Sequence, residues 1–494
     1  MRTAVVAFVL SLITGSVLTP LARRAAKHLG AIDHALSSRK IHAHPIPRLG
    51  GVAIVGAFYV PILGLLVADS SVGYLFYSSH GKAVALLLGG ALIAALGIYD
   101  DIKGAGARLK FAVQFGVGAL VYLLGYRIDS LANPFGEAIQ LGWLGLPFTL
   151  LWIAGVINAI NLIDGLDGLA GGVALISVLT TCTAALYHGE PLMVLFTATL
   201  AGGILAFLRH NFNPASIFMG DTGSMFLGFV LATSSIQTHH KSSTAVAIVV
   251  PIIALGLPIA DTLLAIVRRG ARGAPLFHAD REHIHHKLLE RGFSQRQAVL
   301  VLYGVSVALA LVALFFATAS GTAAAFILAG LALVGGLVLR YLGYLRVERA
   351  AELLEERRRN LELRKNVRLA GVRLRRAAEV VEVWDLIRET TPTLGADCVS
   401  LRFVERPPAG VGQPRQFAEG FDRVDVPFFR TKHSLLVERP DAACIELGWR
   451  DRKAIDRDTE LAVEQLCRYV QGALERVSNL DTAAPTVKRA ARTR

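Results

Sequence analysis

The sequence predicts an all-α polytopic membrane protein with about eleven transmembrane helices, followed by a C-terminal cytoplasmic α+β domain. Only 18% of the 494 residues are charged and 53% are hydrophobic, whereas soluble domains carry about 25% charged residues. The charges are also unevenly placed, with 36 in residues 1–345 and 53 in residues 346–494. Apolar runs close to the ~20 residues that cross a bilayer recur through the first part. These observations exclude a single soluble globule and a secreted disulfide scaffold.

Each span in residues 1–345 is expected to be helical, because lipid cannot satisfy free backbone polar groups. The first apolar run is followed by Arg23, Arg24 and Lys27 without a small-residue cleavage signature, so we interpret it as a span and not as a signal peptide. The predicted spans are 4–22, 50–68, 82–99, 109–126, 146–162, 168–187, 191–208, 222–237, 244–266, 297–317 and 321–345.

Basic residues orient these spans. The loops 23–49, 100–110, 209–220 and 267–296 contain 17 Lys and Arg, whereas the opposite side contains 4. The positive-inside rule makes the first set cytoplasmic, which places the N-terminus outside and the C-terminal domain in the cytoplasm. Orientation therefore explains the net charge of +13 without a nucleic-acid partner. The four cysteines lack metal-ligand spacing and are expected to be reduced thiols.

Acidic residues gather on the same side. Of the 14 Asp and Glu in the membrane part, ten fall on the cytoplasmic loops or helix ends. These ten are Asp33, Asp100, Asp101, Asp164, Asp167, Asp221, Asp261, Asp280, Glu282 and Glu290. Such a one-sided cluster indicates a site for a divalent cation and a phosphorylated substrate.

The first cytoplasmic segment, SSRKIHAHPIPRLGG, places Lys40 and Arg48 ahead of Gly50 and Gly51. Basic side chains beside a glycine pair suit a phosphate group, because glycine lets the backbone approach the anion. Orientation of the chain in the membrane explains the same charges equally well.

The second segment, GIYDDIKG, ends an apolar helix with the adjacent acids Asp100 and Asp101. Adjacent carboxylates repel each other, so a nearby cation or a changed protonation state is needed to keep both there. Charged helix ends are the plainer explanation, but they rarely pair two acids directly after an apolar span. We expect a functional site.

The third segment, NAINLIDGLDGLAGG, is the most informative. Asn158, Asn161, Asp164 and Asp167 recur every three residues and so stay close to one face of a helix. Polar groups at the end of a membrane-embedded run are costly and usually mark a functional path.

The fourth segment, FMGDTGSMFLGF, contains Phe218 and places Asp221 in a glycine turn that opens a helix. An acid there can hold a metal while the N-terminus of the helix faces phosphate. Asp221 as an N-cap of that helix is the alternative, and both roles are compatible.

The fifth segment, HADREHIHHKLLERG, carries Arg281, His283, His285 and His286. Three clustered histidines could bind zinc, but beside phosphate they would more simply donate hydrogen bonds to its oxygens. Asp261, at the end of the preceding span, is expected to pair with an arginine of this loop.

In order and spacing, the five segments resemble those of the polyprenyl-phosphate N-acetylhexosamine-1-phosphate transferase family (glycosyltransferase 4 type) of bacterial membrane enzymes. The resemblance covers residues 1–345, including the number of helices. The RKIHAHPIPRLGG and HIHH segments are similar to the undecaprenyl-phosphate GlcNAc-1-phosphate transferase branch, which starts lipopolysaccharide O-antigen and related cell-wall polymers. The phospho-N-acetylmuramoyl-pentapeptide branch has three consecutive histidines, whereas here Ile284 separates His283 from His285.

The resemblance implies transfer of N-acetylhexosamine 1-phosphate from a UDP-sugar to undecaprenyl phosphate, with release of UMP. It implies a bacterial cytoplasmic (inner) membrane protein that uses Mg²⁺, with Mn²⁺ as a substitute. A homodimer is a separate expectation, based on pairing of the charged helix at 346–390 with its copy. Asp221 and Asn161 would bind the metal, and Asp100 and Asp101 would deprotonate the lipid phosphate or orient the water shell of the metal.

The resemblance also assigns the remaining polar residues. Asp164 and Asn158 would belong to the catalytic cluster, and Asp167 with Phe218 would hold the uracil. The sugar-phosphate end of the donor would be held by Arg281, His283, His285 and His286.

The C-terminal part divides into a charged linker helix at 346–390, a small α+β domain at 391–480 that resembles a GAF-type domain, and a disordered basic tail at 481–494. Ala350, Leu353, Leu354 and Leu361 are expected to form one apolar stripe of the linker, interrupted at Gly371. Strands are expected at 398–405, 421–429, 433–439 and 443–449, before a helix at 458–477. Its ligand or partner is unknown, and regulation or protein interaction is the hypothesis.

Three alternatives remain open at this point. A pentapeptide-specific transferase would use the same site on another UDP-sugar. A membrane-anchored sensor would have no need for the polar residues on one side of the membrane. A transporter would need ionisable residues near the middle of the membrane, and this sequence has almost none.

Overall fold

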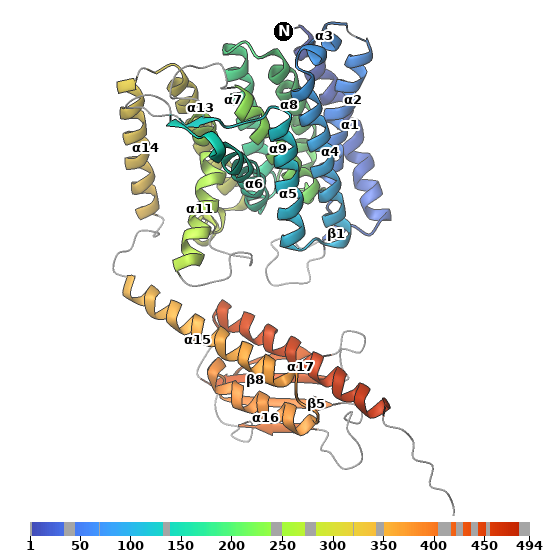
Figure 1. Ribbon diagram of the computed structural model, residues 1–494, viewed down its shortest axis with the longest axis vertical. Coiled ribbons are helices and arrows are strands. Elements are labelled where there is room, and N and C mark those ends of the chain that lie inside the picture. The colour runs from blue at the N-terminus through green and yellow to red at the C-terminus, as the bar shows by residue number, and fades with distance from the viewer. Residues whose placement is uncertain are drawn as a thin grey trace, which may run out of the picture. The chain divides into compact units, whose positions relative to one another are not determined.

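Figure 1 shows a computed structural model of the chain, which divides into two compact units. The first unit contains residues 1–267 and 277–345, and the second contains residues 268–276 and 346–494. The structure describes all residues except 1, 34–44, 69, 132–138, 239–248, 272–282, 320, 342–349, 404–415, 421–427, 436–442, 451–454 and 484–494.

The first unit is a helical bundle with two short hairpins. Its helices are α1 Arg2–His28, α2 Gly50–Ala68, α3 Ser70–Ser78, α4 His80–Lys103, α5 Ala107–Leu123, α6 Gly145–Ile163, α7 Leu169–Tyr187, α8 Pro191–Asn211, α9 Gly220–Thr238, α10 Val249–Ala254, α11 Gly256–Ala271, α12 Ile284–Glu290, α13 Gln295–Ala317 and α14 Gly321–Tyr341. The hairpins pair β1 Ile32–Asp33 with β2 Ile46–Pro47, and β3 Ser130–Leu131 with β4 Ile139–Gln140.

A helix lies at each of the predicted spans. Among the described residues, eight helices are long and apolar enough to cross a membrane, namely α1, α2, α4, α6, α7, α8, α13 and α14. The mostly helical architecture with several candidate membrane helices is thereby confirmed, while insertion into a membrane and the count of eleven spans stay predictions.

The predicted single span at 244–266 is wrong in one respect, because the described part of it is broken. Helix α10 ends at Ala254 and α11 begins at Gly256. Pro258 has no N–H to donate to the carbonyl of Ala254, which removes a bond that a continuous helix would need.

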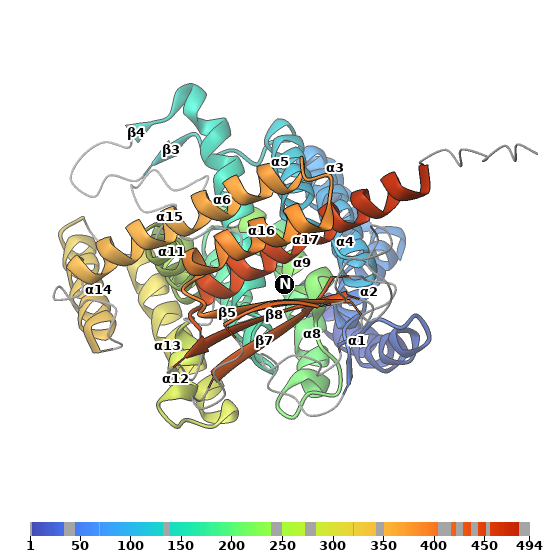
Figure 2. The same ribbon diagram turned by 90° about the horizontal axis from the view of Figure 1, so that it is seen from below.

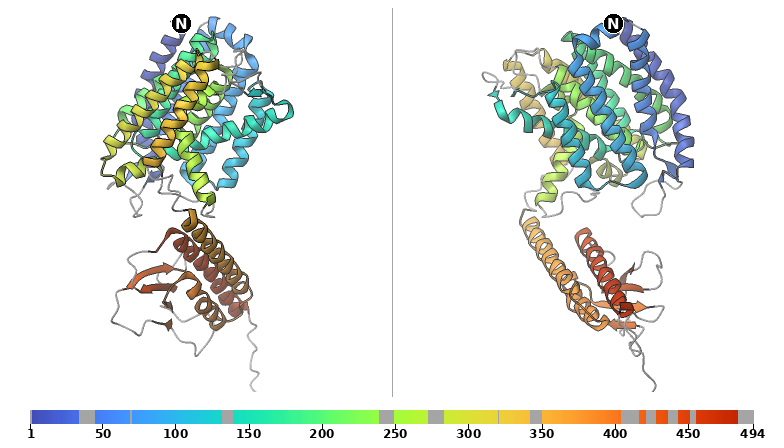
Figure 3. Two further views of the ribbon diagram at one scale, coloured as in Figure 1. Left: turned by 90° about the vertical axis from the view of Figure 1, so that its left-hand side faces the viewer. Right: turned by 45° about the vertical axis from the view of Figure 1, so that its right-hand side comes forward.

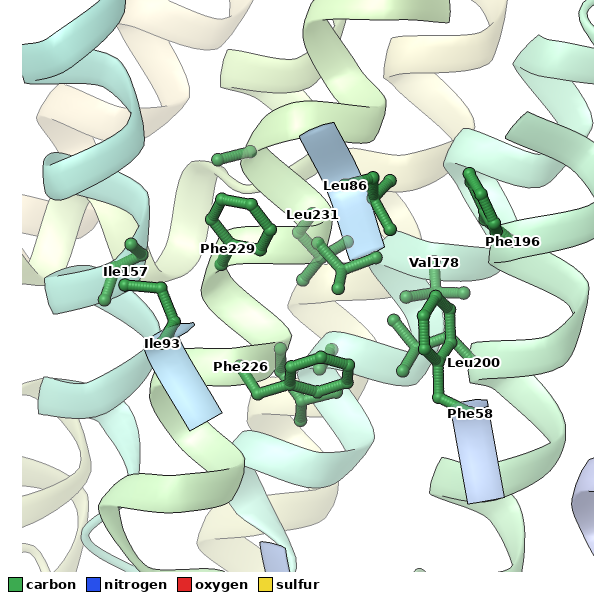
Figure 4. Packing of buried hydrophobic residues seen from close by; sticks show 14 of the residues in the cluster. Phe58, Leu86, Ile93, Ile157, Val178, Phe196, Leu200, Phe226, Phe229 and Leu231 are labelled. Carbon is green, nitrogen blue, oxygen red and sulfur yellow. The ribbon is translucent and has the colours of Figure 1, made fainter. Parts of the chain in front are cut away.

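Helix α9 contacts α2, α4, α6 and α7. Figure 4 shows Phe226 and Phe229 of α9 among Ile93 of α4 and Ile157 of α6, and these four side chains are 0% exposed. The ring of Phe226 also meets Phe58 of α2, with centroids 5.4 Å apart. Helix α9 is therefore surrounded by other helices along its length.

Glycines let two helices approach the first turn of α9 closely. A Cβ at Gly97 of α4 would lie 2.3 Å from Thr222 Cα, and one at Gly51 of α2 would lie 2.0 Å from Gly223 N. Neither position tolerates a side chain without movement of the backbone. The end of α4 is thereby held directly beside the start of α9.

The second unit is a four-stranded antiparallel sheet with helices on one face, as Figures 2 and 3 show. The strand order is β6-β5-β8-β7, and Val399 and Leu401 of β5 pair with Leu447 and Ile445 of β8. The strands are β5 Cys398–Phe403, β6 Gln416–Glu419, β7 Phe428–Ser434 and β8 Ala443–Arg450. The helices are α15 Ala350–Leu374, α16 Val380–Thr390 and α17 Arg457–Ala483, with a 3-10 turn at Thr391–Leu394.

The strands at 398–405 and 443–449 and the helix at 458–477 are confirmed in kind. The runs 421–429 and 433–439 were predicted as two strands, but their described parts belong to the single strand β7, and β6 was not predicted. Residues 421–427 and 436–442 lie outside the described residues. The assignment of this unit to the GAF type and the exact domain boundaries stay predictions.

The predicted linker helix at 346–390 is wrong as a single helix. It consists of α15 and α16, and Val383 and Trp384 of α16 lie in the core of the second unit. Leu361, assigned to the apolar stripe, is 51% exposed. The buried stripe instead passes through Gly371, where a Cβ would lie 2.4 Å from the ring of Tyr469. Because Gly371 has no side chain, Tyr469 of α17 packs directly on the backbone of α15, and the glycine does not interrupt the stripe.

Candidate active site

The carboxylate of Asp101, at the end of α4, holds the first turn of α9. Its Oδ1 accepts a hydrogen bond from the backbone N of Asp221 at 2.9 Å. Its Oδ2 accepts bonds from the backbone N of Thr222 at 3.0 Å and from Thr222 Oγ1 at 2.6 Å. The first N–H groups of a helix have no partner inside the helix, and here a neighbouring helix supplies one. Asp101 is 3% exposed and fixes the backbone of Asp221.

Lys110, in the first turn of α5, lies between Asp100 of α4 and Asp221 of α9. Its Nζ donates to Asp100 Oδ2 at 2.8 Å and forms a second salt bridge with Asp221 Oδ2. The backbone N–H of Ala105 donates to the other carboxylate oxygen of Asp100. Two carboxylates from different helices therefore share one cation, which offsets their mutual repulsion.

The two asparagines of α6 have different partners. Asn161 Nδ2 donates to Ser224 Oγ at 2.9 Å and so faces the first turn of α9. Asn158 Nδ2 donates to Gln114 Oε1 at 2.7 Å, and Gln114 lies one turn beyond Lys110 on α5. The structure thus brings Asn161 to the first turn of α9, which contains Asp221, whereas the bond of Asn158 joins α6 to α5.

Asp164 follows the last residue of α6 and is partly buried. Burial, reinforced by the negative charges of Asp221, Asp101 and Asp167, raises the pKa of Asp164 to about 7. The predicted convergence of acids from separate segments is therefore present, because Asp164 interacts electrostatically with the carboxylates of α4 and α9.

Asp167 ties the same turn to the segment before α9. Its Oδ2 accepts hydrogen bonds from Asn213 Nδ2 and from the backbone N of Ala215, both at 3.0 Å. Asn213 also donates to Gln295 Oε1 of α13 at 2.9 Å. The turn between α6 and α7 and the approach to α9 are thus fastened to each other at Asp167.

Helix α13 supports this turn from another side. Gly168 has a φ of 79°, a left-handed conformation that favours glycine. Its N–H donates to Asn211 Oδ1 at 3.1 Å, and its carbonyl accepts from the hydroxyl of Tyr303. The ring of Tyr303 rests on Gly172, where a Cβ would lie 1.9 Å from it.

The first cytoplasmic segment reaches the same cluster through backbone bonds. Phe218 N donates to Pro47 O at 2.8 Å, and Gly50 N donates to Phe218 O at 2.9 Å. Arg48 donates to the backbone O of Asp101 at 2.8 Å, and its Nε is buried without a hydrogen-bond partner among the described residues. Arg48 and Phe218 therefore lie beside the acids, as expected. Lys40 lies outside the described residues.

The histidine segment begins with a buried Asp–His pair. Asp261 Oδ2 lies 2.8 Å from His283 Nδ1, and Asp261 Oδ1 accepts from the backbone N of Ile284 at 2.9 Å. The described partners of Asp261 are thus a histidine and a helix start, and the expected pairing with an arginine of this loop stays a prediction, because Arg272 lies outside the described residues. The expected residue Arg281 lies outside the described residues.

His285 joins this segment to the Asp164 turn. Its ring lies against Gly165, where a Cβ would be 2.5 Å from His285 Nε2, and it stacks on His283 with centroids 5.7 Å apart. Burial lowers the pKa of His285 to about 3, so the ring is neutral. It is 2% exposed, and neither ring nitrogen has a partner among the residues described. His286 is adjacent, at 4.3 Å between ring centroids.

The donors fit a magnesium ion better than a transition metal. No group of three His, Cys, Asp or Glu side chains forms a ready metal site in the described part of the chain. Magnesium typically takes one or two carboxylates and completes its shell with water and substrate phosphates. Asp221 and Asp100 already share a cation, the ammonium of Lys110, which shows that the two carboxylates can converge on one positive charge.

Sequence reasoning missed Lys110, Thr222 and Gln114. Lys110 looked like one of several basic residues that set the orientation of a loop, and nothing in its spacing separated it from Lys103 or Arg108. The signal that could have identified it is its position in the first turn of the helix that follows the acid pair.

The fold and this site define a helical protein with eight candidate membrane spans among its described residues, in which carboxylates and amides from four helices meet at the helix ends. A family model described as glycosyl transferase family 4 matches residues 83–239. A protein of Bacillus subtilis (strain 168), named a probable undecaprenyl-phosphate N-acetylglucosaminyl 1-phosphate transferase, is 39% identical over 300 residues, which cover 60% of this chain and 81% of that protein.

Two further relatives agree. The decaprenyl-phosphate N-acetylglucosaminephosphotransferase of Mycobacterium tuberculosis (strain ATCC 25618 / H37Rv) is 33% identical over 320 residues, covering 59% of this chain and 78% of the relative. The undecaprenyl-phosphate alpha-N-acetylglucosaminyl 1-phosphate transferase of Escherichia coli (strain K12) is 28% identical over 287 residues, covering 57% and 75%. The chain belongs to the polyprenyl-phosphate N-acetylhexosamine-1-phosphate transferase family, in the branch that these relatives represent. The resemblance drawn from the five segments is confirmed.

Proposed function

We propose that the chain transfers N-acetylglucosamine 1-phosphate from UDP-N-acetylglucosamine to undecaprenyl phosphate and releases UMP. An oxygen of the lipid phosphate attacks the phosphorus that carries the sugar, and the bond from that phosphorus to the UMP oxygen breaks. The names of the relatives support this reaction, and none of those described names a pentapeptide donor. The observation that carries the proposal within the molecule is the convergence of Asp100 and Asp221 on one cation.

Two anions must meet in this reaction, so neutralisation of charge and positioning dominate catalysis. Lys110 supplies a fixed positive charge at the centre of the acids, and Arg48 supplies another beside them. Both are placed by hydrogen bonds before any substrate binds, which is the arrangement that lowers a barrier without reorganisation.

The adjacent acids take different roles in this proposal. Both oxygens of Asp101 are used by three hydrogen bonds to the first turn of α9, so Asp101 acts as a positioning residue. Asp100 faces Lys110 and would accept a proton from a phosphate that binds beside the ammonium. Asp100 is therefore the member of the pair that we assign to deprotonation of the lipid phosphate.

Asp221 and Asn161 would hold Mg²⁺, or Mn²⁺ in its place. When bound, the ion would neutralise the diphosphate and stabilise the departing UMP. Ser224, which accepts from Asn161, fixes the orientation of that amide. Asp164, with its raised pKa, would lose its proton more readily beside such a cation.

The donor sugar nucleotide is assigned to the opposite side of the cluster. Asp167 and Phe218 would hold the uracil, and the neutral ring of His285 would donate or accept a hydrogen bond at the sugar-phosphate end, with His283 and His286 beside it. The buried, unpartnered nitrogens of His285 among the described residues support this assignment, because such groups are costly unless a ligand satisfies them.

The same proposal places the reaction at the cytoplasmic face of a bacterial inner membrane, with the N-terminus outside and the second unit in the cytoplasm. The distribution of Lys and Arg over the loops supports this orientation. The product would begin a lipid-linked envelope polysaccharide.

The test is UMP release by the purified full chain with undecaprenyl phosphate and a panel of UDP-sugars, with Mg²⁺ and with a chelator. We expect release with UDP-N-acetylglucosamine and Mg²⁺, and loss of release in Asp221→Ala. If UDP-N-acetylmuramoyl-pentapeptide were the only donor in the panel that gave UMP release, the proposed donor would be wrong. Activity of Asp221→Ala equal to that of the unaltered chain would overturn the proposed site.

A further inference from the structure

Helix α15 has a basic and apolar face that is turned away from the core of the second unit. Arg357, Leu361, Lys365, Arg368 and Val372 form this outer face, and at 3.6 residues per turn they fall within about 80° of one another. Leu361 is 51% and Val372 48% exposed, and the three basic residues of this face are exposed as well. The opposite face packs on the core through Leu363, Val367 and Leu374.

The basic residues of the outer face differ from the other basic residues of the same helix. Arg359 pairs with Asp456, Arg364 with Asp458, and Arg373 with Glu389. In contrast, Arg357, Lys365 and Arg368 have no acidic partner within the described part of the chain. The helix therefore uses its flanking cations for internal contacts and leaves three on one exposed face.

Unpaired cations interleaved with exposed Leu and Val are typical of a helix that lies in a lipid–water interface. The apolar side chains enter the headgroup boundary while Lys and Arg attract anionic lipids. A merely solvated face would not need two large apolar side chains at about half exposure.

The chain itself brings this face to a membrane. Helix α14, one of the candidate spans, ends at Tyr341, and α15 begins at Ala350. Nine residue steps extend over at most about 32 Å. A lipid surface is thus always within reach, at an effective concentration that a free protein partner would not match.

We propose that the outer face of α15 binds the anionic headgroup surface of the membrane that contains α14. The contact is electrostatic and apolar, so it requires anionic lipid and weakens in high salt. It is independent of the proposed transferase reaction, because none of its residues belongs to the acid cluster, which consists of Asp100, Asp101, Asp164, Asp167 and Asp221.

The test uses the full chain in lipid nanodiscs with a fluorescent label on L361C and a nitroxide quencher on the lipid headgroups. Cys398, Cys444 and Cys467 are buried, and labelling of the unaltered chain measures the background from the partly buried Cys182. We expect stronger quenching in phosphatidylcholine mixed with phosphatidylglycerol than in phosphatidylcholine alone, and loss of the difference in high salt.

A charge-matched pair of variants isolates the outer face. R357Q/K365Q/R368Q removes its three cations, and R402Q/K432Q/R468Q removes three exposed cations elsewhere in the second unit. Each surface Lys or Arg changes such an equilibrium about fivefold, so the first triple variant should lower docking by about 100-fold and the second should not.

Thermal unfolding of both triple variants separates loss of docking from loss of fold. Equal quenching with and without phosphatidylglycerol, or equal effects of the two triple variants, would overturn the proposal. In the first case the face would be left to solvent or to a protein partner.

Discussion

The carboxylate of Asp261 on α11 and the ring of His283 form a buried pair, with Asp261 Oδ2 2.8 Å from His283 Nδ1. The second oxygen of Asp261 accepts from the backbone N of Ile284, the first residue of α12. One side chain thus fixes both the ring orientation of a histidine and the start of the helix that carries His285. His285, on that helix, lies against Gly165, the residue after Asp164.

Asp261→Asn should therefore reduce activity while the bundle remains folded. The amide keeps the shape of the carboxylate, but its NH₂ group would face either His283 Nδ1 or the backbone N–H of Ile284, both of which now meet an oxygen. Loss of a hydrogen bond to a charged group costs about 1.5–3 kcal/mol, so we expect UMP release to fall about tenfold to a hundredfold. Glu290→Gln, at an exposed position of α12, is the matched control. Unchanged release by Asp261→Asn would limit the pair to a structural role.

Lys110→Met should be one of the most damaging single changes in the site. It leaves Asp100 and Asp221 facing each other without the shared cation, and removes a positive charge from the place where phosphates meet. We expect kcat to fall by about a hundredfold, since truncating one member of a hydrogen-bonded charge cluster costs about 2–4 kcal/mol. Lys110→Arg should retain part of the activity. Release measured across a Mg²⁺ titration checks whether added metal replaces the lost charge, and wild-type kcat in Lys110→Met would remove Lys110 from the mechanism.

Substitution of Asp101 should affect stability, and substitution of Asp100 should affect activity. In Asp101→Asn an amide NH₂ would face the backbone N–H of Asp221 or Thr222, so we expect the free energy of unfolding to fall by about 1–3 kcal/mol. Asp100→Asn should lower UMP release with a smaller effect on unfolding. Thermal unfolding in detergent and activity, measured on the same samples, test this division. Equal destabilisation by both variants would contradict it.

Much of the helical architecture followed from the apolar runs, because a membrane span must be long, apolar and internally hydrogen-bonded. What the runs could not predict is which helix is central. Helix α9 is surrounded because Gly97 and Gly51 let α4 and α2 approach it, and close approach depends on partners far away in the sequence. The break before Gly256 was predictable from Pro258 but was hidden in an apolar run.

The candidate site was predictable as a set of acids and amides, since two adjacent acids directly after an apolar span and amides inside a membrane-embedded run are uncommon. Their individual partners were not. Asp100 and Asp101 are indistinguishable in sequence, yet one residue of rotation along a helix turns Asp101 to α9 and Asp100 to Lys110. The predicted apolar stripe of α15 was wrong for the same reason. Leu361 and Leu363 are equally apolar, and only the position of α17 decides which of them is buried.

Deletion of residues 346–494 should leave basal transferase activity. The acid cluster draws all its described residues from the first unit, and the second unit has its own core. We expect UMP release within about threefold of that of the full chain, a change of less than 1 kcal/mol in the barrier. Membrane fractionation and thermal unfolding must show that the shortened chain is inserted and folded. Complete loss of activity in such a sample would give the second unit a part in catalysis.

The contribution of Asp164 to stability should fall as pH rises in the absence of metal. Asp164 has a pKa of about 7 in the folded chain and 3.8 in the unfolded reference, so between these values the folded state holds a proton that the unfolded state has released. Asp164 therefore lowers the free energy of unfolding as pH rises across this window. His285, whose pKa is lowered from 6.5 to about 3, acts in the opposite direction up to pH 6.5, so the effect of Asp164 is measured as the difference between Asp164→Asn and the unaltered chain. Thermal unfolding with a chelator at pH 5 to about 8 should give a more negative slope for the unaltered chain than for Asp164→Asn. Mg²⁺ should reduce this difference by stabilising the ionised carboxylate. Equal slopes for Asp164→Asn and the unaltered chain would show that the proton is bound elsewhere.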